Sequence, residues 1–289
     1  MATFPPPGPV SNVGERAPPR RRHHRANFAA TGHTAPVAAG PIGFPRAFTR
    51  TTPPTETAIV AHRGAWGVAA ENTLAAFENA INLGADMIEF DVRRTGDGRL
   101  VVHHDPDRDG LPLSGVRATA LDGPRAAPPR LVEVLDLVRG RIQIDIELKE
   151  RGCVPDVIPL LRTFGLERCL LTSFHDDVVA AAKAAAPTLT VGLLIGRYRR
   201  ASELFPGRRL ATARADVLVI HDRLVHTGVL RRIRLPCLVW TVNAPGRLTR
   251  NLADPRVAGV ITDLPQAALQ TRRRLEGAVS RRTASAVPS

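Results

Sequence analysis

Two pairs of acidic residues in this sequence have the spacing of metal ligands on β-strands. Glu89 and Asp91 are two residues apart, and Asp145 and Glu147 repeat that spacing further along the chain. Side chains two residues apart leave the same face of a strand, so each pair converges. Glu89, Asp91 and Glu147 therefore form a candidate set of oxygen ligands, which favour Mg²⁺ or Ca²⁺ over zinc. Surface salt bridges are the alternative, but the apolar residues on either side of these carboxylates are not typical of a solvated edge.

Two histidines follow apolar runs in the same part of the sequence. His62 ends one run and His104 follows another. A lone histidine is more often a core residue than a catalyst, but two beside a metal site favour acid-base chemistry, because their pKa values lie near neutrality. Arg63 and Lys149 add the positive charge that an anionic substrate such as a phosphate ester requires. Their alternative role is to neutralise the carboxylates, and both roles are compatible.

Short apolar runs alternate with amphipathic stretches from residue 58 onwards. Eight strands are predicted at residues 58–61, 86–92, 142–148, 168–173, 189–195, 216–220, 236–241 and 257–262. Helical patterns follow most of them, at residues 73–83, 154–164, 176–186, 223–232, 245–252 and 265–275. Polar residues end six of the strands, and in a parallel barrel all such ends open on one face. An open doubly wound sheet would use fewer strand ends. The sequence therefore predicts an α/β fold, a (β/α)8 TIM barrel.

One segment interrupts the alternation of strands and helices. Residues 93–141, between the second and third barrel strands, contain Thr95-Gly96-Asp97-Gly98 followed by an apolar return from Leu100 to His103. Asp-Gly between apolar runs predicts a hairpin turn. A helix near residues 131–138 is expected to end this small insertion.

The ends of the chain differ in composition from its centre. Residues 1–56 are rich in Pro and Arg without a regular period and are predicted to be a disordered leader. The barrel is assigned to residues 57–272, and residues 273–289 to a basic disordered tail. Much of the net charge of +13 lies in these two ends. They lack the motifs of nucleic-acid binding, so no specific nucleic-acid partner is expected.

Composition narrows the class of protein further. Cys153, Cys169 and Cys237 are too far apart for a zinc motif or a disulfide framework. No apolar run approaches the length of a transmembrane helix. The residues after the N-terminal arginines form no convincing signal sequence, so a cytoplasmic location is expected, with export as the alternative. The oligomeric state is not readable from the sequence.

The order of several motifs resembles the glycerophosphodiester phosphodiesterase family, which belongs to the phospholipase-C-like phosphodiesterase superfamily. The resemblance covers roughly residues 58–268, and its motifs are specific in combination rather than singly. They are His62-Arg63-Gly64, Glu71-Asn72-Thr73, residues 84–92, residues 101–105, Ile146-Glu147-Leu148-Lys149, Ser173-Phe174, Trp240-Thr241-Val242-Asn243 and residues 259–265.

The resemblance implies roles for individual residues. The divalent metal, Mg or Ca, would be held by Glu89, Asp91 and Glu147, with His62 and His104 as the catalytic pair. Arg63 and Lys149 would lie near the phosphate, and Trp240 would line the alcohol side, although a tryptophan in a strand is often core. Glu71 would contact the residues that surround the metal ligands, or would be an acid in the first turn of a helix.

The implied reaction is metal-dependent hydrolysis of small glycerophosphodiesters to an alcohol and glycerol 3-phosphate. Two departures from the family pattern occur. Ala70 stands where proline is usual, which bears on the loop after His62, and the stretch after Asp105 is shorter than the usual insertion, which bears on headgroup preference. One alternative is a lipid-acting barrel phosphodiesterase, phospholipase D-like or sphingomyelinase D-like. The other is a basic module that binds nucleic acid or membrane.

Overall fold

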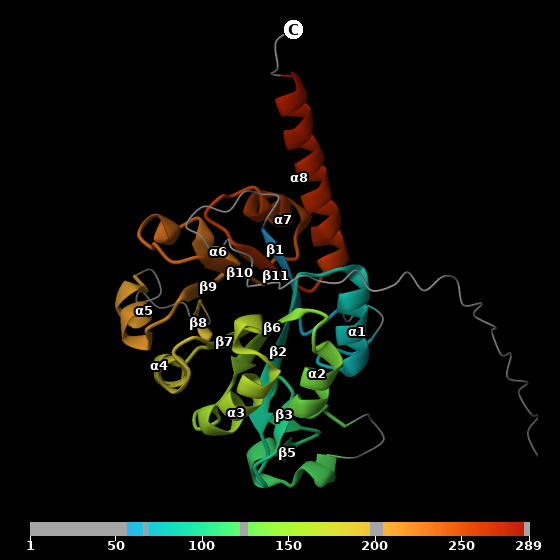
Figure 1. The fold of residues 1–289 in the computed structure, drawn as a ribbon, viewed down its shortest axis with the longest axis vertical. Helices are drawn as coiled ribbons and strands as arrows, with labels where there is room; N and C mark the ends of the chain where they lie inside the picture. Colours follow the sequence, from blue (N-terminus) through green and yellow to red (C-terminus); the bar gives the residue numbers. More distant parts are fainter. Residues whose placement is uncertain (1–56, 66, 68, 122–126, 197–204, 286–289) are drawn as a thin grey trace, which may run out of the picture. The chain divides into compact units, whose positions relative to one another are not determined.

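A computed structural model describes residues 57–65, 67, 69–121, 127–196 and 205–285. The predicted leader, residues 1–56, lies outside the described residues. Eight parallel strands form a closed barrel, because β1 pairs with both β2 and β11 (Figure 1). The predicted (β/α)8 barrel is confirmed. Its strands are β1 (Ala58–His62), β2 (Met87–Arg94), β6 (Gln143–Leu148), β7 (Cys169–Ser173), β8 (Thr190–Ile195), β9 (Val217–His221), β10 (Cys237–Trp240) and β11 (Gly259–Thr262).

Helices follow the strands and surround them (Figure 1). They are α1 (Leu74–Leu83), α2 (Leu131–Val138), α3 (Val154–Phe164), α4 (Asp176–Ala185), α5 (Gly207–Ala213), α6 (Asp222–Val225), α7 (Pro245–Leu252) and α8 (Pro265–Ser285). Short 3-10 turns η3 (Leu166–Arg168) and η5 (Val229–Arg231) join some of them to the next strand. Within the described ranges, no helix combines the length and the apolar character needed to cross a membrane.

Alternate residues of each strand face two separate apolar layers. Ile144, Ile146 and Leu148 of β6 belong to the large cluster between strands and helices. A smaller cluster fills the barrel interior, as is usual for this architecture. It contains Val60, Met87, Leu170, Leu194, Val217, Val219, Leu238, Ala258 and Ile261. Apolar side chains thus fill the barrel interior, and polar side chains gather at the carboxyl ends of the strands.

The insertion between β2 and β6 forms as predicted. Strand β3 (Leu100–Val102) returns antiparallel to β2, with Val92 opposite Val102. The short strands β4 (Asp107–Arg108) and β5 (Leu111–Pro112) pair with each other, and the turns η1 (Leu113–Gly115) and η2 (Ala118–Leu121) follow. Helix α2 then closes the insertion and leads back into the barrel.

Three helical segments differ from the sequence prediction. The helix expected at 223–232 is divided into α6 and η5, because Gly228 takes the left-handed conformation, with φ 85°. Helix α5 was not predicted. The tail expected to be disordered from residue 273 continues α8 to Ser285, because Arg, Leu, Glu and Ala extend a helix that is already anchored. Arg272 provides an anchor by pairing with Asp86 at 2.5 Å.

Gly64 allows the loop after β1 to approach α1 closely. Its φ is +87°, and a Cβ built at this position would lie 2.8 Å from the backbone carbon of Ala76 in α1. The next residue is held to the same helix turn by a hydrogen bond from Ala65 N to Ala76 O. A side chain at position 64 would therefore displace the loop that carries Arg63 and follows His62.

We expect Gly64→Ala to destabilise the protein more than Gly98→Ala. Both glycines have positive φ, which costs alanine about 1–2 kcal/mol, but the Cβ at position 98 meets nothing within 4 Å. The backbone overlap at position 64 should add about 1–3 kcal/mol. Urea unfolding of the two variants measures the difference, and equal losses would contradict the role of the close approach.

Candidate active site

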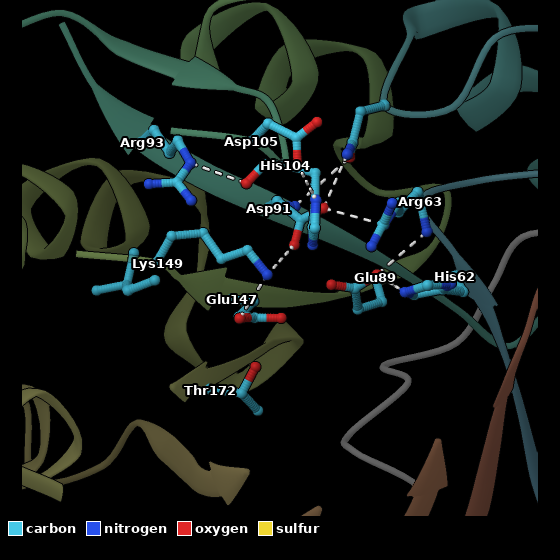
Figure 2. Close-up of polar contacts among 12 residues, drawn as sticks. His62, Arg63, Glu89, Asp91, Arg93, His104, Asp105, Glu147, Lys149 and Thr172 are labelled. Atoms are coloured by element: carbon cyan, nitrogen blue, oxygen red, sulfur yellow. Dashed lines mark hydrogen bonds and ion pairs between the residues drawn. The ribbon is translucent and has the colours of Figure 1, made fainter. Parts of the chain in front are cut away.

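Three buried carboxylates meet at the ends of β2 and β6. Glu89, Asp91 and Glu147 offer oxygen atoms that all lie within 4.8 Å of one another (Figure 2). Their residues are 4%, 1% and 8% exposed, so the alternative of surface salt bridges is wrong. Adjacent parallel strands bring them together, since Asp91 lies opposite Glu147 in the register of β2 and β6.

Two cationic side chains contact this carboxylate cluster. The Nζ atom of Lys149 lies 2.9 Å from Asp91 Oδ1 and 2.7 Å from Glu147 Oε1. Nε of Arg63 lies 3.2 Å from Asp91 Oδ2. Arg63 and Lys149 therefore neutralise part of the negative charge while remaining beside the site, as the sequence analysis allowed.

The loop between β1 and α1 holds its polar groups in a strained conformation. Arg63 and Asn72 both have φ 55°, which is uncommon for residues other than glycine. The backbone N–H of Arg63 donates to Glu89 Oε2, and Asn72 Nδ2 donates to Asp91 Oδ2 at 2.8 Å. Strain of this kind costs about 1–3 kcal/mol per residue and persists where neighbouring contacts enforce it. Here it positions the loop over the metal-ligand candidates.

His62 is oriented by residues that follow the last two strands of the barrel. Its Nδ1 lies 2.5 Å from Asp263 Oδ1, and Asn243 Nδ2 donates to the other oxygen of that carboxylate at 2.5 Å. Burial raises the pKa of Asp263, but the hydrogen bond and charge of His62 lower it below the ordinary value. With Nδ1 engaged, Nε2 of His62 is the free ring nitrogen and lies 3.9 Å from Glu89 Oε2.

His104 reaches the site from the insertion, on the side of Asp91 (Figure 2). Its Nδ1 lies 2.7 Å from Asp105 Oδ1, and Arg93 Nε donates to its backbone carbonyl at 2.8 Å. Its side chain is 37% exposed, against 18% for His62. Burial lowers the pKa of His104, and the nearby charge of Asp91 opposes this change. A ring nitrogen of His104 is therefore available near the outer side of the cluster.

The electrostatics of the carboxylate cluster fit a divalent cation. Burial raises the pKa of Glu89 well above its ordinary value, and repulsion from Asp91 and Glu147 raises it further. Burial also raises the pKa of Asp91, but Lys149 and Arg63 lower it more, to about 2. Hard oxygen ligands that repel one another in a buried position are typical of Mg²⁺ or Ca²⁺ sites.

Trp240 lies at the upper end of the barrel interior. It packs against the interior apolar cluster, and its ring makes edge contacts with Phe174 and His221, with centroid distances of 5.4 and 4.8 Å. It is only partly buried. Trp240 is therefore a core residue on one side and borders the strand ends on the other.

Most of the predicted site residues converge, and several of their partners were not predicted. Glu71 does not lie in the first turn of α1, which begins after Thr73; it binds Arg63 instead, at 2.8 and 3.0 Å. Sequence reasoning gave Asn72 and Asp263 no part in holding the metal or moving protons. Both residues lie in motifs that resemble the family, Asn72 in Glu71-Asn72-Thr73 and Asp263 in residues 259–265. Their partners, Asp91 and His62, are distant in the sequence, so the motifs alone did not reveal these contacts.

Comparisons with known proteins agree with this geometry. Residues 62–120 match the model of the Glycerophosphoryl diester phosphodiesterase family. A glycerophosphodiester phosphodiesterase of Bacillus altitudinis is 30% identical over 251 residues, which cover 76% of this chain and 100% of that protein. Fold, site and relatives together define a phosphodiester hydrolase. The chain belongs to the glycerophosphodiester phosphodiesterase family.

Solved structures share the barrel. A glycerophosphodiester phosphodiesterase from Parabacteroides distasonis superposes with a TM-score of 0.68 at 24% identity, covering 76% of this chain and 98% of its own. A phosphodiesterase from Oleispira antarctica, determined in complex with the product sn-glycerol-3-phosphate, gives 0.64 at 23% identity, covering 75% and 96%. Because the sequence identities are below 25%, these two structures support the fold of this chain and do not by themselves assign its activity.

We expect Glu89→Gln to raise the melting temperature of the metal-free protein at pH 7. A carboxyl whose pKa is raised in the folded state destabilises that state once the pH exceeds its ordinary value, here 4.5. Each kcal/mol recovered should raise the melting temperature by about 2–4 °C. Thermal unfolding in the presence of a chelator measures this effect.

The same variant should lose stabilisation by metal. Mg²⁺ or Ca²⁺ at about 100 times its dissociation constant should stabilise the unmodified protein by about 2.7 kcal/mol. Glu78→Gln is the matched control, because the Glu78 side chain is 39% exposed and pairs with Arg141 away from the cluster. An equal metal-induced shift in Glu89→Gln and the unmodified protein would exclude Glu89 as a ligand.

Proposed function

We propose that this protein hydrolyses small glycerophosphodiesters to an alcohol and glycerol 3-phosphate. The observation that carries the proposal is a buried carboxylate cluster beside His62, flanked by Arg63 and Lys149. The name of the relative from Bacillus altitudinis and the product bound in the Oleispira antarctica phosphodiesterase support the same substrate class.

Glu89, Asp91 and Glu147 would hold a divalent cation, Mg²⁺ or Ca²⁺. When bound, such a cation polarises the phosphoryl oxygen and stabilises the charge that develops on it. Arg63 and Lys149 contribute positive charge at the edge of the same cluster, where they bind and orient the phosphate group. The carboxylates thus bind the cation, and the two basic side chains keep the substrate anion beside it.

His62 and His104 would move protons on the two sides of the phosphate. His62 lies deeper, and Asp263 holds its Nδ1, so Nε2 accepts the proton of the neighbouring glycerol hydroxyl as its oxygen attacks phosphorus. Attack with loss of the alcohol leaves a cyclic phosphate, which water then opens to glycerol 3-phosphate as the two histidines exchange roles. His104 is more exposed, and its free Nε2 gives a proton to the oxygen of the leaving alcohol, which departs into solvent. Asp263 favours the charged form of His62 that results from the first transfer.

We expect purified protein to release glycerol 3-phosphate from glycerophosphocholine and related diesters only when a divalent metal is present. A chelator should abolish release, and added Mg²⁺ or Ca²⁺ should restore it. His62→Ala and His104→Ala should each lower kcat by about 10²–10⁴-fold, because each removes one proton transfer. His226→Ala is the matched control, since His226 is exposed and belongs to none of the site contacts described.

Two results would contradict the proposed function. Cleavage of lysolipids without cleavage of any glycerophosphodiester would favour the lipid-acting alternative. Absence of hydrolysis in both cases, with steep salt-dependent binding to nucleic acid or anionic vesicles, would favour the basic binding module.

Asp263→Asn should lower kcat by about 10²-fold or more while leaving metal-induced thermal stabilisation in place. The amide keeps the shape of Asp263 but no longer stabilises the positive charge on His62. Steady-state kinetics across pH, together with thermal unfolding, measure the two effects. Asp254→Asn is the control, because that carboxylate pairs with Arg256 outside the site. Unchanged kcat in Asp263→Asn would argue against the proton-transfer role of His62.

A further inference from the structure

Arg93 links the segment that carries His104 to the end of a barrel strand. Its Nε atom donates to the backbone carbonyl of His104 at 2.8 Å (Figure 2). Its Nη1 atom donates to Oε1 of Glu150, also at 2.8 Å. Glu150 lies two residues beyond Leu148, where β6 ends. One guanidinium group therefore joins the insertion to the carboxyl end of β6.

Arg93 lies on the same face of β2 as two of the candidate metal ligands. Glu89, Asp91 and Arg93 alternate along this strand, so their side chains leave it in one direction. Glu89 and Asp91 contribute to the carboxylate cluster, and Arg93, nearest the carboxyl end of the strand, reaches His104. The side chain of Arg93 is 11% exposed, so water competes little for its hydrogen bonds.

The backbone of His104 has few other constraints. His104 lies beyond the end of β3, where the N–H of His103 donates to the carbonyl of Asp91 at 3.0 Å. In the part of the chain that the structure describes, the bond from Arg93 is the only hydrogen bond made to the backbone of His104. The ring of His104 is held by Asp105, whose side chain is 67% exposed. The position of His104 therefore depends strongly on Arg93.

A guanidinium group suits this role better than an ammonium group. Its donors are fixed in one plane, so acceptors on two different segments set both its position and its rotation. The Glu150 carboxylate supplies one acceptor and balances the charge, and the His104 carbonyl supplies the other. A lysine ends in a single donor atom on a flexible chain and would not fix both segments at once.

The contacts of Arg93 also separate it from the other basic residues of the site. Arg63 and Lys149 form ion pairs with carboxylates of the cluster, whereas Arg93 forms its ion pair with Glu150. The functions proposed above for the cation, the phosphate and the two proton transfers make no direct use of Arg93 or Glu150. An effect of Arg93 on the reaction would therefore act through His104.

We propose that Arg93 is a positioning residue, which Glu150 orients and which holds His104 where its ring can protonate the leaving alcohol. This inference rests on the proposed function. As the bond between phosphorus and the alcohol oxygen breaks, His104 Nε2 gives its proton to that oxygen. A displacement of about 1 Å at such a group can lower the rate by about 10²-fold.

The test compares two substrates that differ in their need for this proton. They are glycerophosphocholine and the diester of glycerol 3-phosphate with 4-nitrophenol. The oxygen of choline leaves as a strongly basic alkoxide unless it is protonated, whereas 4-nitrophenolate is a weak base and leaves without a proton. Because kcat/KM covers only the steps up to departure of the alcohol, opening of the cyclic phosphate does not enter it.

We expect Arg93→Gln to lower kcat/KM for glycerophosphocholine by about 10–10²-fold and to change it little for the 4-nitrophenyl diester. His104→Ala should show the same selective loss, and Glu150→Gln a smaller one. The measured quantity is the ratio of the two values, so the amount of folded protein cancels. Arg94→Gln is the matched control on the same strand, because Arg94 pairs with Asp156 and its side chain is 39% exposed.

A double variant tests whether Arg93 acts through His104. Adding Arg93→Gln to His104→Ala should cause no further loss with glycerophosphocholine, because the group that Arg93 positions is already absent. Metal-induced thermal stabilisation should be the same in Arg93→Gln and in the unmodified protein, since the ion pair of Arg93 lies outside the carboxylate cluster.

Three results would overturn the inference and leave the proposed function intact. They are unchanged kcat/KM in Arg93→Gln, an equal loss with both diesters in that variant, and a further loss in the double variant. An equal loss with both diesters in His104→Ala would overturn the proton-donor role of His104 and this inference with it. Hydrolysis of neither diester by the unmodified protein would overturn the proposed function as a whole.

Discussion

Burying Glu89, Asp91 and Glu147 within 4.8 Å of one another is unfavourable unless positive charge compensates it. The contacts around the cluster follow from this constraint. Lys149 bridges two of the carboxylates, Arg63 lies against Asp91, and the backbone N–H of Arg63 and the amide of Asn72 satisfy further oxygens. Glu89 retains a raised pKa after these compensations. Burial of the negative charge, together with the remaining repulsion between the carboxylates, is the physical reason that the site fits a divalent cation.

The barrel holds these carboxylates in place before any cation binds. Carboxylates on β2 and β6 are held by the backbone hydrogen bonds of paired strands, so little side-chain freedom remains to be lost on binding. The two histidines proposed to move protons lie at the rim: His104 in the insertion, and His62 at the end of β1 with its orienting Asp263 beyond β11. The carboxylates therefore lie within paired strands, and the two histidines lie at a strand end and in the insertion that follows β2, on the face where sites of parallel barrels form.

The sequence by itself determined the eight strands, the faces on which Glu89, Asp91 and Glu147 lie, and the hairpin after β2, because these depend on a period of two and on local turn chemistry. Local patterns did not reveal α5 or the extension of α8 to Ser285, since anchoring contacts such as Arg272 with Asp86 join residues 186 positions apart. Only the tertiary structure decided the partners of the site residues. Closure of the barrel places β1 beside β11 and so brings Asp263 to His62 across 201 positions. Asn72 reaches Asp91 through a loop with positive φ. These features depend on the order in which strands meet in space, which no local pattern encodes.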